Sequence, residues 1–128
     1  ILASRIGKGE KAYQLFLHAT RLDLDDYNNE ADQGLHITSM PGSWLAIVRG
    51  FAGMQVLKET LCFSPVIPQK WDSYSFKVNY LKNTLHIRVG KEIEISLTAG
   101  SKVDIQVYGH PYTLERGTEL KINMPMCQ

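Results

Sequence analysis

The sequence predicts an α+β chain in which helices come first and a small antiparallel β-sandwich or jelly-roll-like domain follows. Apolar residues recur with the helical period before Gly53 and at every second position after it. Turn residues also divide the second half into short segments. These two observations place a helical region at residues 1–56 and a β-sheet domain at residues 57–128.

Length and composition are those of one ordinary globular core. The chain has 128 residues, of which 44% are hydrophobic and 21% charged. A net charge of +1 gives no electrostatic footprint for nucleic acid or for an anionic membrane surface. No apolar run approaches the roughly 20 residues that cross a bilayer. We therefore expect neither nucleic acid nor a membrane as a partner.

The start of the chain and its cysteines predict the context of the protein. The sequence begins at Ile1 without a methionine or a secretory signal, and we interpret it as an internal fragment of a larger protein. Cys62 and Cys127 do not make a disulfide framework, which predicts a reducing cytoplasm. The histidines and cysteines have no metal-site spacing, so no metal is expected.

Two helical segments precede the most informative stretch of the chain. Residues 1–7 are interpreted as the end of a helix, with Gly7 and Gly9 as the break. An amphipathic helix is predicted from Glu10 to about Leu24, packed as an antiparallel hairpin against the helix that follows. Its buried face would consist of Ala12, Leu15, Phe16, Ala19 and Leu22.

The acidic connection DLDDYNNEADQ, residues 23–33, has two functional interpretations that the residues do not favour. A calcium loop would need glycine at its sixth position and glutamate at its twelfth, where the sequence has Asn28 and Gly34. Asp25 and Asp26 could do acid–base chemistry, but neighbouring loop carboxylates more often cap backbone groups or remain solvated.

The stretch GLHITSMPGSWLAIVRGFAGM, residues 34–54, predicts a helix that starts near Ser39. Thr38 and Ser39 can accept hydrogen bonds from first-turn N–H groups, and Pro41 is tolerated there because it lacks an N–H group. His36 precedes this start, so a histidine, hydroxyls and a positive helix end could cradle an anion. The alternative is a structural histidine beside an ordinary cap, and the residues alone favour this alternative.

The body of the same helix is apolar nearly all round. One face has large side chains, namely Trp44, Leu45, Val48 and Phe51. Another has a stripe of small residues, Gly42, Ala46 and Gly50, that would let a neighbouring backbone approach closely. Such a helix is typical of a larger helical assembly, which supports the fragment interpretation, although the strands could cover one side.

The remainder predicts seven short antiparallel strands. The first contains Leu61 and Phe63 and is followed by a break at Pro65 and Pro68 before Trp71. Polar and apolar residues alternate in the other six. Their apolar positions are Phe76, Val78 and Tyr80; Leu85, Ile87 and Val89; Ile93, Ile95 and Leu97; Val103, Ile105 and Val107; Tyr112 and Leu114; Leu120, Ile122 and Met124.

Three motifs in order carry a resemblance to a known family. They are ATRLDLDDYNN at residues 19–29, the stretch at residues 34–54, and LCFSPVIPQKWDSYSFKVNY at residues 61–80. Together they resemble the C-terminal end of glycoside hydrolase family 65, which contains disaccharide phosphorylases for maltose, trehalose, kojibiose and nigerose. The sequences of the first two motifs most closely resemble those of the family members that use maltose.

The resemblance implies an N-terminal β-sandwich, a linker, an (α/α)6 catalytic barrel and a C-terminal β-sheet domain. Residues 1–56 would be the last helices of the barrel and residues 57–128 the C-terminal domain. It also implies an inverting phosphorolysis, in which phosphate attacks the anomeric carbon and a glutamic acid protonates the leaving oxygen. Maltose would give β-glucose 1-phosphate and glucose. The family's catalytic glutamate lies upstream, and no residue of this chain matches it.

What does map onto this chain is the family's phosphate pocket. His36 and Ser39 resemble its phosphate ligands, and Thr38, the Met40 backbone and Gly42 lie close by in the motif. The resemblance therefore favours the anion cradle over the structural histidine. It implies inorganic phosphate as a co-substrate with no other cofactor, a disaccharide as substrate, and the rest of the same polypeptide and a second subunit of a homodimer as partners.

Alternatives remain at this level. The enzyme could be a trehalose or kojibiose phosphorylase, or a hydrolase of the same family. The strand region could be a carbohydrate-binding module that stacks sugars on Trp71, Tyr74, Tyr80 or Tyr112. It could also be a structural domain that braces the barrel without a ligand of its own, which is the interpretation we favour for the strands alone.

Overall fold

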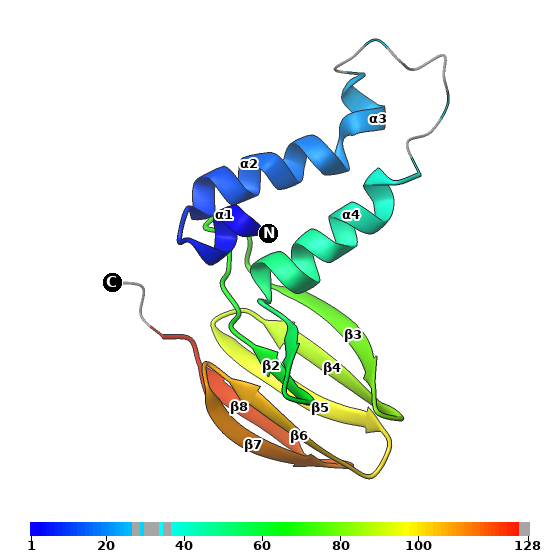
Figure 1. The fold of residues 1–128 in the computed structure, drawn as a ribbon. Coiled ribbons are helices and arrows are strands. Elements are labelled where there is room, and N and C mark those ends of the chain that lie inside the picture. The colour runs from blue at the N-terminus through cyan, green and yellow to red at the C-terminus, as the bar shows by residue number, and fades with distance from the viewer. Residues whose placement is uncertain (27–28, 30–33, 35–36, 126–128) are drawn as a thin grey trace.

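The computed structural model describes residues 1–26, 29, 34 and 37–125. Helices form the upper part of the molecule in Figure 1, and two sheets packed face to face form the lower part. This arrangement confirms the predicted class, in which helices precede mainly antiparallel strands. The (α/α)6 barrel remains a prediction, because it would extend beyond this chain.

The first helices are α1 (Leu2–Arg5), α2 (Gly9–Thr20) and α3 (Leu22–Asp25). The predicted helix from Glu10 to about Leu24 thus ends earlier than expected, because Arg21 separates α2 from α3. The Thr20 hydroxyl donates to the Phe16 carbonyl at 3.1 Å. Such local bonding lets threonine compete with continued helical hydrogen bonding.

The predicted second helix of the hairpin consists of α4 (Ser39–Leu45) and η2 (Ala46–Phe51), a π-helix that continues it. It starts at Ser39 as predicted and lies antiparallel to α2 (Figure 1), which confirms the hairpin. In its π-helical part the N–H of Ala52 donates to the carbonyl of Ile47, five residues back, at 2.8 Å. The sequence did not predict this wider turn.

The stripe of small residues meets a neighbouring backbone at one of its ends. A Cβ placed on Gly50 would lie 3.5 Å from the Cα of Ile1, whereas one placed on Gly42 would have nothing within 4 Å. The Ser4 hydroxyl of α1 also donates to the Gly50 carbonyl at 2.8 Å. Among the described residues, close backbone approach is therefore confirmed at Gly50 and not found at Gly42.

The large apolar face of this helix is buried only in its C-terminal half. Val48 and Phe51 are 0% and 3% exposed, whereas Trp44 and Leu45 are 47% and 37% exposed. The C-terminal half abuts the β-sandwich (Figure 1), so the strands cover this end of the helix.

Within the described residues, the strands form two four-stranded sheets. One sheet has the order β1 (Gln55–Leu57), β2 (Thr60–Phe63), β6 (Lys102–Val107) and β7 (His110–Glu115). The other has the order β3 (Tyr74–Tyr80), β4 (Asn83–Val89), β5 (Glu92–Ala99) and β8 (Glu119–Asn123).

Two details of the strand prediction are corrected. The described residues contain eight strands rather than seven, because β1 pairs with β2. Its apolar residues, Val56 and Leu57, are adjacent and both exposed, so no alternation marked the strand. In addition, β2 and β6 are paired in parallel. The chain passes through β3, β4 and β5 of the other sheet between them, so no tight hairpin joins the two strands.

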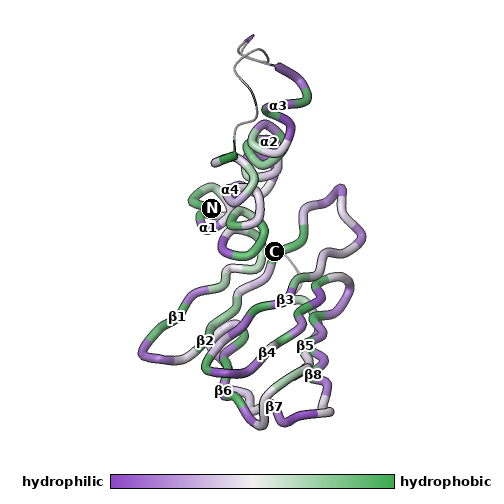
Figure 2. Tube along the Cα trace, turned by 90° about the vertical axis from the view of Figure 1, so that its right-hand side faces the viewer, coloured by the Kyte–Doolittle hydropathy of each residue, from purple (hydrophilic) through white to green (hydrophobic). Residues whose placement is uncertain are grey.

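The core lies between the two sheets and consists of the predicted alternating positions. Figure 2 shows hydrophobic and hydrophilic residues alternating along the strands. Side chains from both sheets are fully buried there, among them Leu61, Phe63, Leu85, Ile87, Ile93, Ile95, Ile105 and Leu114. Burial of this apolar surface holds the sandwich together.

A cluster of aromatic rings joins the helices to the sandwich. The ring of Trp71, in the connection from β2 to β3, lies 5.3 Å from that of Phe16 in α2 and 5.2 Å from that of Phe51 in η2. Its centroid is also 5.7 Å from that of Tyr74 in β3. All three pairs are edge-to-face, the geometry that aromatic quadrupoles favour.

This packing disfavours the alternative in which Trp71 and Tyr74 stack sugars, because Trp71 contacts the rings of Phe16, Phe51 and Tyr74, and Tyr74 is only 9% exposed. Tyr80 and Tyr112 are half-buried and pack against the core. The Tyr80 hydroxyl donates to the Glu59 carbonyl at 2.6 Å.

The buried hydroxyl of Tyr74 makes the joint sensitive to high pH. It donates to the Val66 carbonyl at 3.0 Å, and burial raises the pKa of Tyr74 above its usual range, with a smaller contribution from Tyr108. An unfolded tyrosine ionises near about pH 10, so the folded form holds its proton longer, and stability falls as the pH rises above this value.

We expect a Tyr74→Phe variant to lose less stability than the unsubstituted protein between about pH 9 and pH 11. Urea unfolding of the complete polypeptide can be followed through exposure of the buried Cys62 thiol to a labelling reagent. Because both proteins carry the same thiol, its own ionisation cancels in the comparison. Parallel stability curves for the two proteins would contradict the expectation.

Candidate functional site

The predicted phosphate-binding segment falls at the start of α4. Ser39 is the first residue of the helix and Thr38 is its N-cap. Gly42 follows in the first turn and is exposed, and a Cβ placed on it would meet no described atom within 4 Å outside its own helix. His36 lies outside the described residues, so its position relative to Ser39 stays a prediction.

Thr38 does not act as the side-chain cap that the sequence suggested. Its backbone is already helical, with φ −67° and ψ −22°, and its side chain makes no capping hydrogen bond. A threonine hydroxyl usually caps from an extended backbone, which points it back at the first turn. The exposed Thr38 hydroxyl is therefore available to a ligand rather than committed to the helix end.

The helix behind this segment is anchored at its other end. The carbonyls of Phe51 and Ala52 accept hydrogen bonds from the N–H groups of Val66 and Ser64 at 2.7 and 3.1 Å. Terminal carbonyls of a helix have no partners within it, so the sandwich supplies them here. The N-terminal end, with the positive end of the macrodipole, is left pointing away from the sandwich (Figure 1).

This geometry suits an anion more than a cation. First-turn N–H groups of a helix point along its axis and have no acceptor within the helix. The Ser43 hydroxyl donates back to the Ser39 carbonyl at 2.9 Å, so Ser43 is not directed toward the helix start. The surface at the helix start is formed by the residues from Thr38 to Gly42. The exposed surface there also includes Met40.

The acidic connection does not form a second site in the described residues. Asp25 is held in a bidentate pair by Arg21, with N–O distances of 2.7 and 2.6 Å. Asp26 ends α3 in the left-handed region at φ 44°. Within the described part of the chain, no three histidine, cysteine or carboxylate side chains gather to hold a metal ion.

Residues 1–26, 29, 34 and 37–125 include no helix that is both long and apolar enough to cross a membrane.

One surface feature has no signal in the sequence. A groove of about 390 Å³ lies between the start of α2 and the connection from β2 to β3. Its walls include Tyr13 on one side and Val66 and Lys70 on the other. Residues so far apart in the chain show no shared pattern, so only the folded structure reveals the groove.

The chain matches two models of one family. Residues 1–45 match the central catalytic domain of glycosyl hydrolase family 65, and residues 54–114 match the C-terminal domain of the same family. The first match ends with α4 and the second begins just before β1, so that η2 lies between the two matches.

Similar proteins support the same family. A maltose phosphorylase of Bacillus subtilis is 46% identical over 90% of this chain and 15% of its own length. An alpha,alpha-trehalose phosphorylase of Geobacillus stearothermophilus is 38% identical over 95% of this chain and 16% of its own length.

Among solved structures, a protein from the human microbiome described as a kojibiose phosphorylase aligns with a TM-score of 0.86 and 37% identity. The alignment covers 94% of this chain and 17% of that one. The chain thus spans about one sixth of the length of the proteins it matches. From these matches and its fold, the chain belongs to glycoside hydrolase family 65.

Proposed function

We propose that the polypeptide containing this chain is a disaccharide phosphorylase that cleaves an α-glucoside with inversion. Maltose is the proposed substrate, and the products are β-glucose 1-phosphate and glucose. The identity of 46% to a maltose phosphorylase supports this choice. The observation that carries the proposal is the start of α4, where Ser39 is half-buried between the exposed residues Thr38 and Met40 and the other end of the helix is held by the sandwich.

In this proposal the start of α4 binds the attacking phosphate. His36 and Ser39 are its ligands, with Thr38, Gly42 and the Met40 N–H group beside them. Charge-assisted hydrogen bonds from these donors hold the phosphate in place for attack on the anomeric carbon. Phosphate arrives as an anion and therefore needs no separate general base, while the proton for the leaving oxygen comes from a glutamic acid outside this chain.

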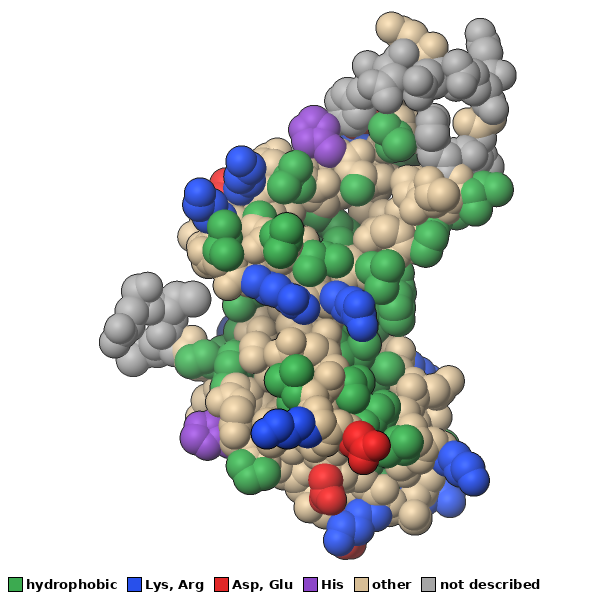
Figure 3. All heavy atoms as spheres, in the orientation of Figure 1, with side chains coloured by type: hydrophobic (Ala, Val, Ile, Leu, Met, Phe, Trp, Pro, Cys, Tyr) green, Lys and Arg blue, Asp and Glu red, His purple; other side chains and the backbone are tan. Residues whose placement is uncertain are grey.

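The exposed apolar side chains of the helices support the assignment of residues 1–56 to the end of a larger barrel. Figure 3 shows hydrophobic side chains gathered over the helices. Those that are most exposed include Leu2, Ile6, Leu15, Leu24, Met40 and Trp44. Large apolar patches on a soluble protein mark surfaces that another part covers. We propose that the rest of the same polypeptide covers them.

Residues 57–128 then form the C-terminal domain, whose role is to brace the helices. The aromatic joint and the hydrogen bonds to Phe51 and Ala52 support this role. A homodimer in the cytoplasm completes the proposal, on the family resemblance alone.

The experiment is to offer the complete polypeptide maltose, trehalose and kojibiose with and without inorganic phosphate. We expect phosphate-dependent release of glucose 1-phosphate from maltose, at a rate at least about tenfold above that from the other two sugars. Faster release from trehalose or kojibiose would replace the proposed substrate and keep the reaction. Release of free glucose alone, independent of phosphate, would identify a hydrolase and overturn the proposal.

A further inference from the structure

The groove between α2 and the sandwich has two walls from different parts of the fold. Glu10 and Tyr13 of α2 line one wall, and Val66, Pro68 and Lys70 of the connection from β2 to β3 line the other. Its volume of about 390 Å³ falls in the range of roughly 300–1,000 Å³ that is typical of small-molecule sites.

The connection that forms the second wall is held in place by hydrogen bonds. The Val66 N–H group donates to Phe51, and the Val66 carbonyl accepts from Tyr74. The Tyr108 hydroxyl donates to the neighbouring Pro65 carbonyl. These hydrogen bonds fix the backbone at Pro65 and Val66, so a ligand would not have to order this part of the wall.

The groove has an apolar floor and a polar rim. Phe51, Val66 and Pro68 supply apolar surface, whereas Glu10 and Gln69 supply polar groups. This combination fits a ligand that has apolar C–H faces and a ring of hydroxyl groups.

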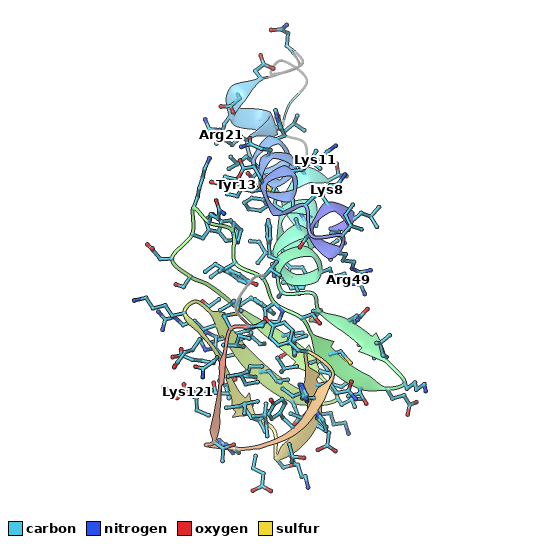
Figure 4. The ribbon with its side chains drawn as sticks, turned by 90° about the vertical axis from the view of Figure 1, so that its left-hand side faces the viewer. Lys8, Lys11, Tyr13, Arg21, Arg49 and Lys121 are labelled. Atoms are coloured by element: carbon cyan, nitrogen blue, oxygen red, sulfur yellow. The ribbon has the colours of Figure 1, made fainter. Side chains whose placement is uncertain are left out.

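The charges at the rim balance each other. The Lys70 ammonium lies 4.0 Å from a Glu10 carboxylate oxygen and 5.3 Å from the centroid of the Tyr13 ring. Figure 4 shows Tyr13 on one side of α2, whereas Lys8 and Arg49 lie on the other side. With no unbalanced charge among its lining side chains, the groove favours a neutral ligand over phosphate.

We propose that this groove binds a neutral pyranose, such as one glucose unit, at a place separate from the start of α4. Its C–H surface would lie against the apolar floor, with Tyr13 at one side beneath Lys70, and its hydroxyls would pair with Glu10, Gln69 and Lys70. The choice of a sugar among neutral ligands rests on the proposed function. The groove opens at the start of α2. The start of α4 at Ser39 lies toward the other end of α2, and α2 is about 18 Å long.

The test reads the groove directly through Lys70, whose side chain is 58% exposed and open to acylation. The complete polypeptide is acylated without phosphate, with glucose or maltose up to about 100 mM, at which even a weak site fills. Mass spectrometry then gives the labelling rate of each lysine. We expect saturable protection of Lys70, no protection of the exposed Lys77 on β3, and at least about tenfold weaker protection in a Tyr13→Ala variant.

Three results would overturn the proposal. They are unchanged labelling of Lys70 at the highest sugar concentration, equal protection in the Tyr13→Ala variant, and equal protection by sorbitol, a polyol without a ring. Because labelling needs no turnover, protection of Lys70 in a protein that releases no glucose 1-phosphate would keep this site while the proposed function failed. Release of glucose 1-phosphate without protection of Lys70 would support the proposed function and overturn the sugar site in the groove.

Discussion

Replacement of Gly53 by alanine is expected to destabilise the joint between helices and sandwich by about 3 kcal/mol. Gly53 has φ 61°, a left-handed conformation that a side chain disfavours. A Cβ there would lie 2.7 Å from the Ser64 carbonyl oxygen and 3.1 Å from the Ser64 N. These are backbone atoms, and the same Ser64 N–H group donates to Ala52, so relief of the clash would disrupt the joint.

Gly117→Ala is the matched control for this prediction. Gly117 also has a left-handed backbone, with φ 84°, but a Cβ there would have nothing within 4 Å. Gly117→Ala should therefore lower the stability of the fold by only about 1 kcal/mol, the cost of placing a side chain on a left-handed backbone. Urea unfolding of the complete polypeptide, followed by labelling of Cys62, measures both variants. Equal losses of stability would show that the contact with Ser64 carries no penalty.

The strands could be predicted because local alternation and burial agree in them. Ile87, Ile95 and Ile105 are each flanked by polar residues in the sequence and are buried in the core. The alternation of apolar and polar residues therefore identifies both the strand and the face that is buried. Val56 in β1 lacks this signal because the strand is short and its apolar side chains remain exposed. The parallel pairing of β2 with β6 depends on contacts far apart in the chain, which periodicity does not report.

The helical part was predictable in its hairpin and not in its details. The start at Ser39 follows from local chemistry, since Pro41 fits only a first turn. The π-helical turn before Phe51 has no such local cause. It lies where Gly50 meets α1 and where Phe51 meets Trp71, so tertiary packing accompanies it.

The sequence left two roles open for Trp71 and favoured a structural one, which agrees with its packing against other rings. An aromatic residue between two prolines and a strand fits either an exposed platform or a packed joint. The choice depends on Phe16 and Phe51, which lie far away in the sequence and close in space. The residues of the phosphate segment are contiguous, so their pattern could be read directly from the sequence, and their role in phosphate binding stays a prediction.

Removal of one phosphate ligand is expected to weaken the use of phosphate by about tenfold to a hundredfold. A hydrogen bond to a charged group contributes about 1.5–3 kcal/mol, which corresponds to this range. His36→Ala and Ser39→Ala should each raise the KM for phosphate and leave the KM for maltose nearly unchanged, because the sugar does not depend on these donors.

Ser43→Ala is the matched control within the same helix. It removes the same hydroxyl group one turn later, where that group donates to the Ser39 carbonyl at 2.9 Å and lies away from the helix start. We expect its phosphate KM to match that of the unsubstituted protein. A rise equal to that of Ser39→Ala would mean that any disturbance of α4, rather than loss of a ligand, weakens phosphate use.

The most direct test of the account is the phosphate saturation curve for glucose 1-phosphate release from maltose by the complete polypeptide and its Ser39→Ala and His36→Ala variants. The account predicts curves shifted to higher phosphate concentration for both variants. Cys62 should stay protected from labelling in both, which shows that the variants remain folded. Normal turnover with unshifted curves would show that His36 and Ser39 are structural, and that this chain contributes packing rather than phosphate binding.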